Sequence, residues 1–248
     1  TMSNKRMLTG VLLSALCVGA SAQEQVVELV GAVQTQGHCR AVEVLNDYAY
    51  VVDGTSVRVF DITRPQSPNF RGAVMLEDVT AIADLAASGD LVCAACGLDG
   101  MRVIDVSNPR EPAMVGAYVA DKQDTLSAEA VALAGGLAYI GGSGFPNDIH
   151  IVDVRVPETP TAVGFYATET NITDVELAGN LLYVTSPVVS KGLEIYDVTN
   201  PDFPSLRGRF ATQDRADAVA LEGNLAFLGE TDGLEIVDVS YPAEPVLM

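Results

Sequence analysis

The sequence predicts an all-β fold, a β-propeller of four-stranded antiparallel blades with five blades visible, and three observations carry this prediction. A block containing an Asp that is followed by Pro recurs five times, at spacings of 41 to 48 residues. Apolar residues alternate with a period of two inside each unit, and Asn, Asp, Gly and Pro separate the short runs. Four short strands repeated at this interval are typical of propeller blades. Helical repeats are excluded by the alternation and by two prolines in every unit.

Residues 1–22 have the pattern of a secretory signal peptide rather than of a folded element. Two basic residues at 5–6 precede an apolar run at 7–18, which is too short to span a bilayer of about 20 residues. We expect cleavage after Ala22 and a secreted, periplasmic or cell-surface location, with residues 23–248 forming the propeller and no membrane insertion after cleavage. An alternative is a lipoprotein anchored at Cys17, against which the bulky preceding Leu16 argues.

Each repeat is expected to supply four strands in chain order. A small apolar run forms the first strand, a tight Asn, Asp or Gly turn follows, and the third strand ends in the repeating Asp. The repeats are placed at approximately 41–79, 80–128, 129–172, 173–216 and 217–248. Their first strands are placed at Ala41–Val44, Ala81–Asp84, Ala130–Leu133, Asp174–Leu177 and Ala218–Leu221.

Closure of the ring is expected to use the N-terminal segment. The fifth repeat ends at Met248, where its fourth strand should begin, and Val26–Val33 resembles the fourth strands of the other repeats. An N-terminal strand at 26–33 would complete the last blade and remove an exposed edge. Thr1 stands before Met2, so the sequence is consistent with a piece of an open reading frame. If more repeats follow, the same strand would close a larger ring.

The five repeating carboxylates are interpreted as structural. An Asp before a Thr/Ser-x-Pro turn can accept backbone N–H bonds and stabilise the connection to the fourth strand. A catalytic group need occur only once, whereas a structural group recurs in each blade. These residues are Asp61, Asp105, Asp153, Asp197 and Asp238.

The repeating block resembles a known family. Val103-Ile-Asp-Val-Ser-Asn-Pro109, followed by Pro112 and by Val115-Gly-Ala-Tyr118, is similar to the LVIVD repeat of exported and cell-surface proteins of bacteria and archaea. The resemblance covers about residues 26–248. It implies a β-propeller outside the cytoplasm and implies no catalytic residues.

Candidate binding residues lie on the face formed by the loops of variable length, where propeller ligands usually bind. The loop before the first blade carries His38 and Arg40, and Asp78 belongs to the carboxylates of this face. Glu129, Asp174 and Asp217 stand at or next to the starts of their first strands, which line the central channel. They could ring its mouth and bind a hard cation, with calcium as the candidate cofactor. The alternative is a solvated acidic surface that keeps the protein soluble.

The remaining chemistry-bearing residues are few. His150 shares its repeat position with Arg58, Arg102, Glu194 and Glu235, from which we expect a solvent-facing side chain. Cys93 and Cys96 lie in a second strand on opposite faces, which predicts buried and inert thiols. A disulfide between Cys39 and Cys96 is an alternative.

Net charge limits the function classes. The chain carries a formal charge of −19, which excludes a general nucleic-acid binder because phosphate binding needs a basic surface. The first hypothesis is a non-enzymatic scaffold that binds a protein or glycan at the cell envelope on its acidic loop face. The alternative is a calcium-dependent hydrolase or lactonase at the channel mouth. Whether the protein is an enzyme stays open, although the sequence favours a protein without enzymatic activity. A third hypothesis is one module of a longer surface protein.

Overall fold

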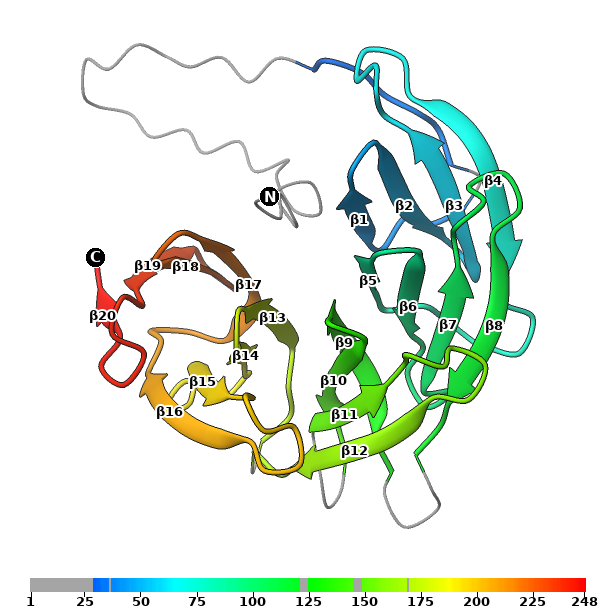
Figure 1. Ribbon diagram of the computed structural model, residues 1–248. Coiled ribbons are helices and arrows are strands. Elements are labelled where there is room, and N and C mark those ends of the chain that lie inside the picture. The colour runs from blue at the N-terminus through cyan, green and yellow to red at the C-terminus, as the bar shows by residue number, and fades with distance from the viewer. Residues whose placement is uncertain (1–28, 36, 121–124, 145–148, 169) are drawn as a thin grey trace.

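Twenty strands form five four-stranded antiparallel sheets in the computed structural model, which describes residues 29–35, 37–120, 125–144, 149–168 and 170–248. The sheets stand side by side around one axis, with their first strands innermost and their fourth strands outermost (Figure 1). The predicted all-β fold of four-stranded antiparallel blades is confirmed. The predicted signal peptide and its cleavage site lie outside the described residues.

Each sheet is one repeat with its strands in chain order, and we call the sheets blades 1 to 5. Blade 1 contains β1 (Val42–Leu45), β2 (Tyr48–Asp53), β3 (Ser56–Asp61) and β4 (Asn69–Met75), and blade 2 contains β5 (Asp84–Ser88), β6 (Leu91–Ala95), β7 (Met101–Asp105) and β8 (Ala113–Tyr118). Blade 3 contains β9 (Ser127–Ala134), β10 (Leu137–Ser143), β11 (Ile149–Asp153) and β12 (Thr161–Tyr166). Blade 4 contains β13 (Asp174–Ala178), β14 (Leu181–Thr185), β15 (Leu193–Asp197) and β16 (Ser205–Phe210), and blade 5 contains β17 (Ala216–Glu222), β18 (Leu225–Glu230), β19 (Leu234–Asp238) and β20 (Val246–Leu247).

The first strand of blade 2 differs from the expected one. The sequence placed it at Ala81–Asp84, whereas β5 spans Asp84–Ser88. The tight turn at Gly89, which has a φ of 59°, fixes the hairpin so that Ser88 pairs with Leu91. The strand therefore ends directly before the turn, and the earlier small apolar residues lead into it.

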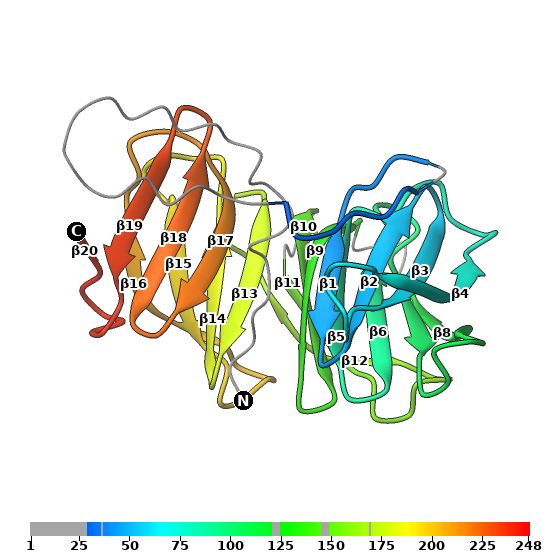
Figure 2. The same cartoon turned by 90° about the horizontal axis from the view of Figure 1, so that it is seen from above.

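The core consists of apolar layers between neighbouring blades. The inner strands contact one another in series, β1 with β5, β5 with β9, β9 with β13 and β13 with β17. One layer joins blades 1 and 2, and corresponding layers join blades 2 and 3, 3 and 4, and 4 and 5. The strands cross the disc from one face to the other, as the edge view shows (Figure 2).

A recurring glycine in the fourth strand allows this close approach. A Cβ atom at Gly116 would lie 1.9 Å from the carbonyl oxygen of Pro157 in the next blade. The same distance is 1.9 Å from Gly164 to Pro201 and 2.0 Å from Gly208 to Pro242. Every such fourth strand therefore packs directly on the third-to-fourth turn of the blade that follows.

The described part of the chain forms an open arc rather than a closed ring. No contact of the kind that joins the other inner strands is found between β17 and β1 (Figure 1). Residues 29–33 of the predicted N-terminal strand form no strand, and residues 26–28 lie outside the described residues. The fourth position of blade 5 is taken by β20, so this structure does not show the predicted closure.

The N-terminal segment nevertheless occupies a fourth-strand position. A Cβ atom at Gly31 would lie 2.0 Å from the carbonyl oxygen of Pro65, as at the other fourth-strand glycines. Residues 29–33 thus lie against blade 1 as the fourth strand of a preceding blade would. The resemblance of this segment to fourth strands therefore reflects its packing.

Candidate functional site

A polar cavity of about 560 Å³ opens where the inner strands begin. It is lined by residues from or directly before all five blades, namely Arg40, Ala83, Glu129, Ser143, Asn171, Ile172, Thr173, Pro187, Arg215 and Asp217. Its volume lies in the range of small-ligand sites, about 300–1,000 Å³. Three of the predicted site residues, Arg40, Glu129 and Asp217, therefore line one cavity.

One position of the repeat, at or next to the start of the first strand, supplies a residue of the cavity lining in every blade. The residue that follows it pairs, in each blade, with the same position of the second strand: Ala41 with Val52, Asp84 with Ala95, Ala130 with Gly141, Asp174 with Thr185 and Ala218 with Gly229. The preceding residues form what we call the mouth ring, which consists of Arg40, Ala83, Glu129, Thr173 and Asp217. The backbone positions are equivalent while the side chains differ in each blade.

The mouth ring carries both signs of charge. Asp217 forms an ion pair with Arg215, and both side chains are about half exposed. Glu129 is exposed and accepts a hydrogen bond from the Ser127 hydroxyl at 2.9 Å. Arg40 is also exposed. The cavity thus offers guanidinium, carboxylate, hydroxyl and amide groups to a polar ligand, and it is less acidic than the sequence predicted.

Asp174 belongs to the framework rather than to the mouth ring. It is 6% exposed, and its two oxygens accept hydrogen bonds from Val175 N at 2.8 Å and Val219 N at 2.9 Å. Asp84, at the same repeat position, accepts a bond from Val131 N at 3.0 Å. The inner edge of a blade has no neighbouring strand, so a carboxylate of the preceding blade satisfies its N–H groups. Asp174 therefore does not line the cavity, and Thr173 takes the ring position.

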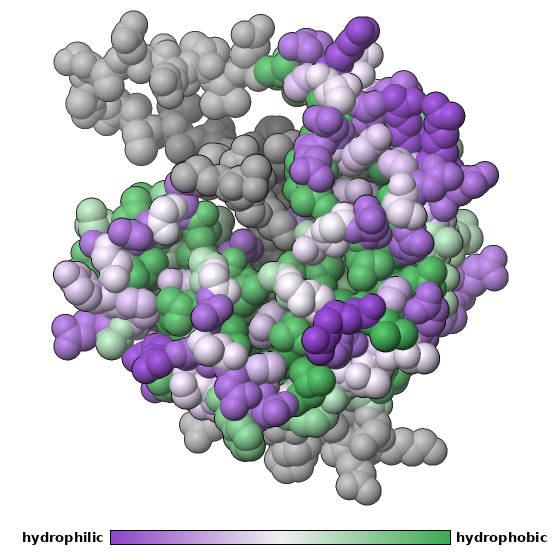
Figure 3. Space-filling view, viewed as in Figure 1, coloured by the Kyte–Doolittle hydropathy of each residue, from purple (hydrophilic) through white to green (hydrophobic). Residues whose placement is uncertain are grey.

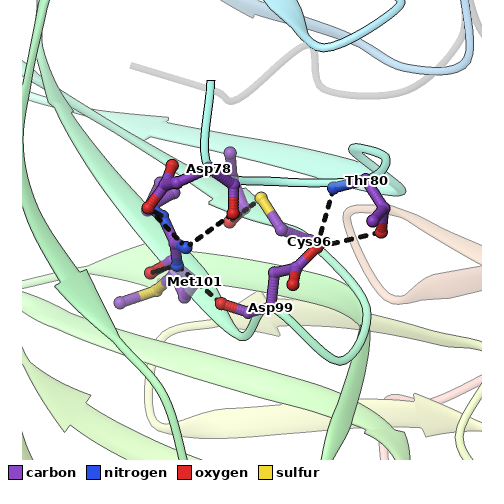
Figure 4. A network of polar contacts seen from close by, with 7 residues as sticks. Asp78, Thr80, Cys96, Asp99 and Met101 are labelled. Atoms are coloured by element: carbon purple, nitrogen blue, oxygen red, sulfur yellow. Dashed lines mark hydrogen bonds and ion pairs between the residues drawn. The ribbon is translucent and has the colours of Figure 1, made fainter. Parts of the chain in front are cut away.

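Asp78 forms an ion pair that joins its loop to Arg102 in β7. Arg102 donates to its Oδ2 from Nε at 3.0 Å and from Nη2 at 2.8 Å. These bonds hold the pKa of Asp78 below its ordinary value. Arg102 also donates to the Asp99 carbonyl at 2.6 Å, and the Asp99 carboxylate accepts from Thr80 N at 2.7 Å (Figure 4). Asp78 does not line the cavity, because this network fixes it above blade 2.

His38 is exposed and also lies outside the cavity lining. Asp53 anchors the loop that carries His38, since its carboxylate accepts a hydrogen bond from Gly37 N. The same carboxylate forms an ion pair with Arg58 at 2.8 Å. The loop is thereby tied to the second-to-third connection of blade 1. Of the two loop residues predicted to bind a ligand, Arg40 lines the cavity and His38 does not.

The five repeating aspartates share one local geometry. Each carboxylate accepts a hydrogen bond from the backbone N–H two residues later, at 2.8 or 2.9 Å; the donors are Thr63, Ser107, Arg155, Thr199 and Ser240. Hydrogen bonds from the side chains of the same residues, together with these backbone bonds, lower the pKa values of the carboxyls. They lie in the third-to-fourth turns, at the opposite ends of the strands from the mouth ring.

The prediction that His150 faces solvent is wrong. His150 is fully buried, and its Nδ1 lies 2.8 Å from the Tyr118 hydroxyl of blade 2. Other charged residues at this repeat position are also buried with a counter-group: Arg102 pairs with Asp78, and Glu194 with Arg209. A row of charged residues in register was interpreted as exposed, but Arg58, Arg102 and Glu194 each form an ion pair with a neighbouring side chain.

Blade 5 departs from this pattern. Glu235, at the same position, is 7% exposed, and no basic, hydroxyl or amide group among the described residues donates to its carboxylate oxygens. Burial and the adjacent Glu235 carboxyl raise the pKa of Glu230. Two acids therefore meet where the other blades pair opposite or neutral groups.

The described cysteines are free thiols, so the alternative disulfide between Cys39 and Cys96 is not formed. Cys93 and Cys96 are fully buried in different apolar layers, as expected for residues three apart in a strand. Burial raises the pKa of both thiols to about 12. Cys39 is exposed.

Neither a metal-binding cluster nor a bilayer-spanning helix is found among the residues that the structure describes. No group of three or more His, Cys, Asp or Glu side chains within them is arranged to hold a metal ion. Within the same residues, no helix has the length and apolar character needed to cross a bilayer.

An arc of four-stranded blades with a polar cavity at its inner strands defines a propeller-like repeat protein. The chain belongs to the LVIVD repeat family, because the model of that repeat matches residues 36–76, 82–120, 127–168, 171–212 and 214–248. The resemblance that the repeating block suggested is thereby confirmed. No curated protein matches the chain.

Two solved structures are similar to the chain in fold. A functionally unknown protein from Desulfotomaculum acetoxidans DSM 771 has a TM-score of 0.71 and 11% identity, over 90% of this chain and 73% of the other. The computationally designed Ika8 protein has a TM-score of 0.59 and 11% identity, over 83% of this chain. The chain spans only 60% of the length of that designed protein. At this identity the likeness concerns the fold alone.

Proposed function

We propose that the protein is an exported, non-enzymatic binding scaffold whose ligand binds in the cavity at the mouth ring. The observation that carries the proposal is that one repeat position in all five blades lines a single cavity with different side chains. A framework role would favour the same residue in each blade, as the repeating aspartates do. Variation at fixed backbone positions is typical of recognition surfaces on repeat proteins.

The ligand class follows from the lining. Arg40 offers a guanidinium, and Glu129, Thr173 and Asn171 offer acceptors and donors suited to hydroxyl and amide groups. A polar protein segment or a glycan at the cell envelope fits this set. The signal-peptide pattern of residues 1–22 supports an envelope or extracellular location.

A capture experiment tests the proposal. Tagged wild-type protein, Arg40→Ala and Arg110→Ala are incubated with an envelope fraction, and captured proteins and glycans are identified. Arg110 is an exposed arginine in the third-to-fourth turn of blade 2, on the opposite face, and is the matched control. We expect one species captured by the wild type and by Arg110→Ala but lost with Arg40→Ala.

Two results would overturn the proposal. The first is capture that Arg40→Ala leaves unchanged. The second is turnover of small lactones or phosphoesters that Glu129→Gln abolishes, which would make the cavity an active site.

A further inference from the structure

Two charges of the mouth ring are not neutralised within the part of the chain that the structure describes. Arg215 and Asp217 form an ion pair, so their charges cancel. Arg40 is exposed, and none of the described residues accepts a hydrogen bond or an ion pair from its guanidinium. Glu129 is also exposed, and the one hydrogen bond that it accepts, from the Ser127 hydroxyl at 2.9 Å, leaves its charge in place. The described lining of the cavity therefore presents one uncompensated positive charge and one uncompensated negative charge.

The two charges stand apart on the ring. Arg40 lies shortly before β1 of blade 1, and Glu129 lies in β9 of blade 3. Blade 2 separates them, because its inner strand β5 contacts β1 on one side and β9 on the other (Figure 1). The ring residue before blade 2 is Ala83, whose side chain has no polar atom. A ligand that meets both charges must therefore carry its own two charges at separated points, on a segment that passes Ala83.

The charge of the whole protein adds a second condition on the ligand. Hydrophilic residues are spread over the blades in the space-filling view (Figure 3), so a charged side chain does not by itself mark a binding site. Arg40 and Glu129 differ from other exposed charges because both line one cavity. The net charge of −19 attracts basic groups and repels acidic ones. An acidic group of the ligand therefore depends on a guanidinium, and Arg40 is the one in the described lining that is not already paired.

The need for both signs of charge favours a polypeptide over a glycan. Lys and Arg carry cations, Asp and Glu carry carboxylates, and one segment can hold both at a fixed spacing. Acidic sugars carry carboxylates, but the nitrogen of most amino sugars is acylated and uncharged. A carboxylate and a guanidinium form two parallel hydrogen bonds, which would orient the segment. Resting on the proposed binding role of the mouth ring, we propose that its ligand is a polypeptide segment with an acidic side chain bound by Arg40 and a basic side chain bound by Glu129.

Labelled peptides test the ligand class. The probes are Gly-Ser peptides with a neutral fluorophore that hold one Glu and one Lys, in either order, separated by one to four residues. Diacidic and dibasic peptides of the same lengths are the comparators. Fluorescence anisotropy at low ionic strength, where salt screens the charges least, measures the Kd of each peptide. We expect the wild type to bind at least one dipolar peptide about tenfold more tightly than either comparator.

Charge reversal should exchange the preference. Arg40→Glu should favour the dibasic peptide and Glu129→Arg the diacidic peptide, because each variant leaves two charges of one sign. The double variant should bind dipolar peptides again. The controls Arg110→Glu and Glu158→Arg make the same charge changes at exposed positions in third-to-fourth turns on the opposite face, and should keep the wild-type preference. Where a reversal lowers Tm, the neutral Arg40→Gln or Glu129→Gln replaces it and should weaken binding of the dipolar peptide about tenfold.

Two outcomes with the peptides would overturn this proposal. They are equal binding of dipolar, diacidic and dibasic peptides by the wild type, and a folded charge-reversed variant that keeps the wild-type preference. The capture experiment separates this proposal from the binding role on which it rests. An envelope species that needs Arg40 but is a glycan would overturn the polypeptide ligand and leave the binding role standing, whereas absence of both capture and peptide binding would overturn both.

Discussion

Asp174 separates a framework role from a metal-binding role in one substitution. Asp174→Ala removes the acceptor of two backbone N–H groups, those of Val175 and Val219, inside a buried region. A buried donor without an acceptor costs about 1–3 kcal/mol, so the variant should lose about 2–6 kcal/mol of unfolding free energy. This is a large part of the 5–15 kcal/mol typical of a folded domain. At about 2–4 °C per kcal/mol, Tm should fall by at least about 4 °C.

Urea unfolding with and without calcium measures this effect. Asp217→Ala is the matched control, because Asp217 was predicted as a ligand of the same cation but forms an exposed ion pair, which is typically worth about 0–1 kcal/mol. We expect Asp174→Ala to be destabilised equally in both conditions, and Asp217→Ala to resemble the wild type. A calcium-dependent rise in wild-type Tm that both substitutions abolish would refute the reasoning.

Three further predictions concern packing, protonation and thiol exposure. Gly116→Ala should cost about 1–3 kcal/mol in urea unfolding through overpacking against the next blade, while Gly233→Ala, which has open space, should stay within about 0.5 kcal/mol of the wild type; equal effects would contradict the blade contact. The pKa of Glu230 is raised above 4.5 in the folded protein, so the folded state favours the protonated carboxyl and loses stability as the pH rises above about 4.5. Glu230→Gln should therefore raise Tm at pH 7 but not below pH 4.5, and a gain in Tm that does not depend on pH would count against this. Among the three described cysteines of the native protein, a thiol reagent should label Cys39 alone, and Cys93 and Cys96 should react only after unfolding; rapid labelling of Cys93 or Cys96 would show that the layers are open.

The fold could be predicted because its signals are local and repeated. Alternation fixes strand faces, and the Asp-x-Thr/Ser turn fixes where the third strand ends, as at Asp105 and Ser107. The start of β5 was misplaced because small apolar residues continue before it, and only the turn at Gly89 decides the register.

The candidate site could be predicted in part. Glu129 and Asp217 were found because they hold one repeat position, whereas Asp174 follows that position by one residue. Successive strand residues point to opposite faces of the sheet. The Asp174 carboxylate therefore points away from the cavity and binds backbone N–H groups of blades 4 and 5. Arg215 and Thr173 were not predicted, because apart from His38 and Arg40 only carboxylates were considered as ligand-binding residues, although Thr173 shares the repeat position of Glu129 and Asp217.

The buried polar groups could not be predicted from one repeat at a time. The partners of His150 and Arg102 come from a neighbouring blade or from a loop, and the contacts depend on how the blades pack. A row of charged residues in register is ambiguous by itself, because either water or a counter-charge can stabilise it.

The mouth ring places its polar side chains outside the apolar layers that hold the blades together. Arg40, Glu129 and Asp217 are exposed or half exposed and lie outside the apolar layers that join the blades, so under the proposed binding role their exchange would alter recognition with little effect on folding, whereas Thr173 also donates a hydrogen bond to the Ala216 carbonyl of blade 5. Each blade therefore contributes one residue to the mouth ring. Under the proposed binding role, substitutions at these positions could change the ligand specificity, in nature or in a designed library.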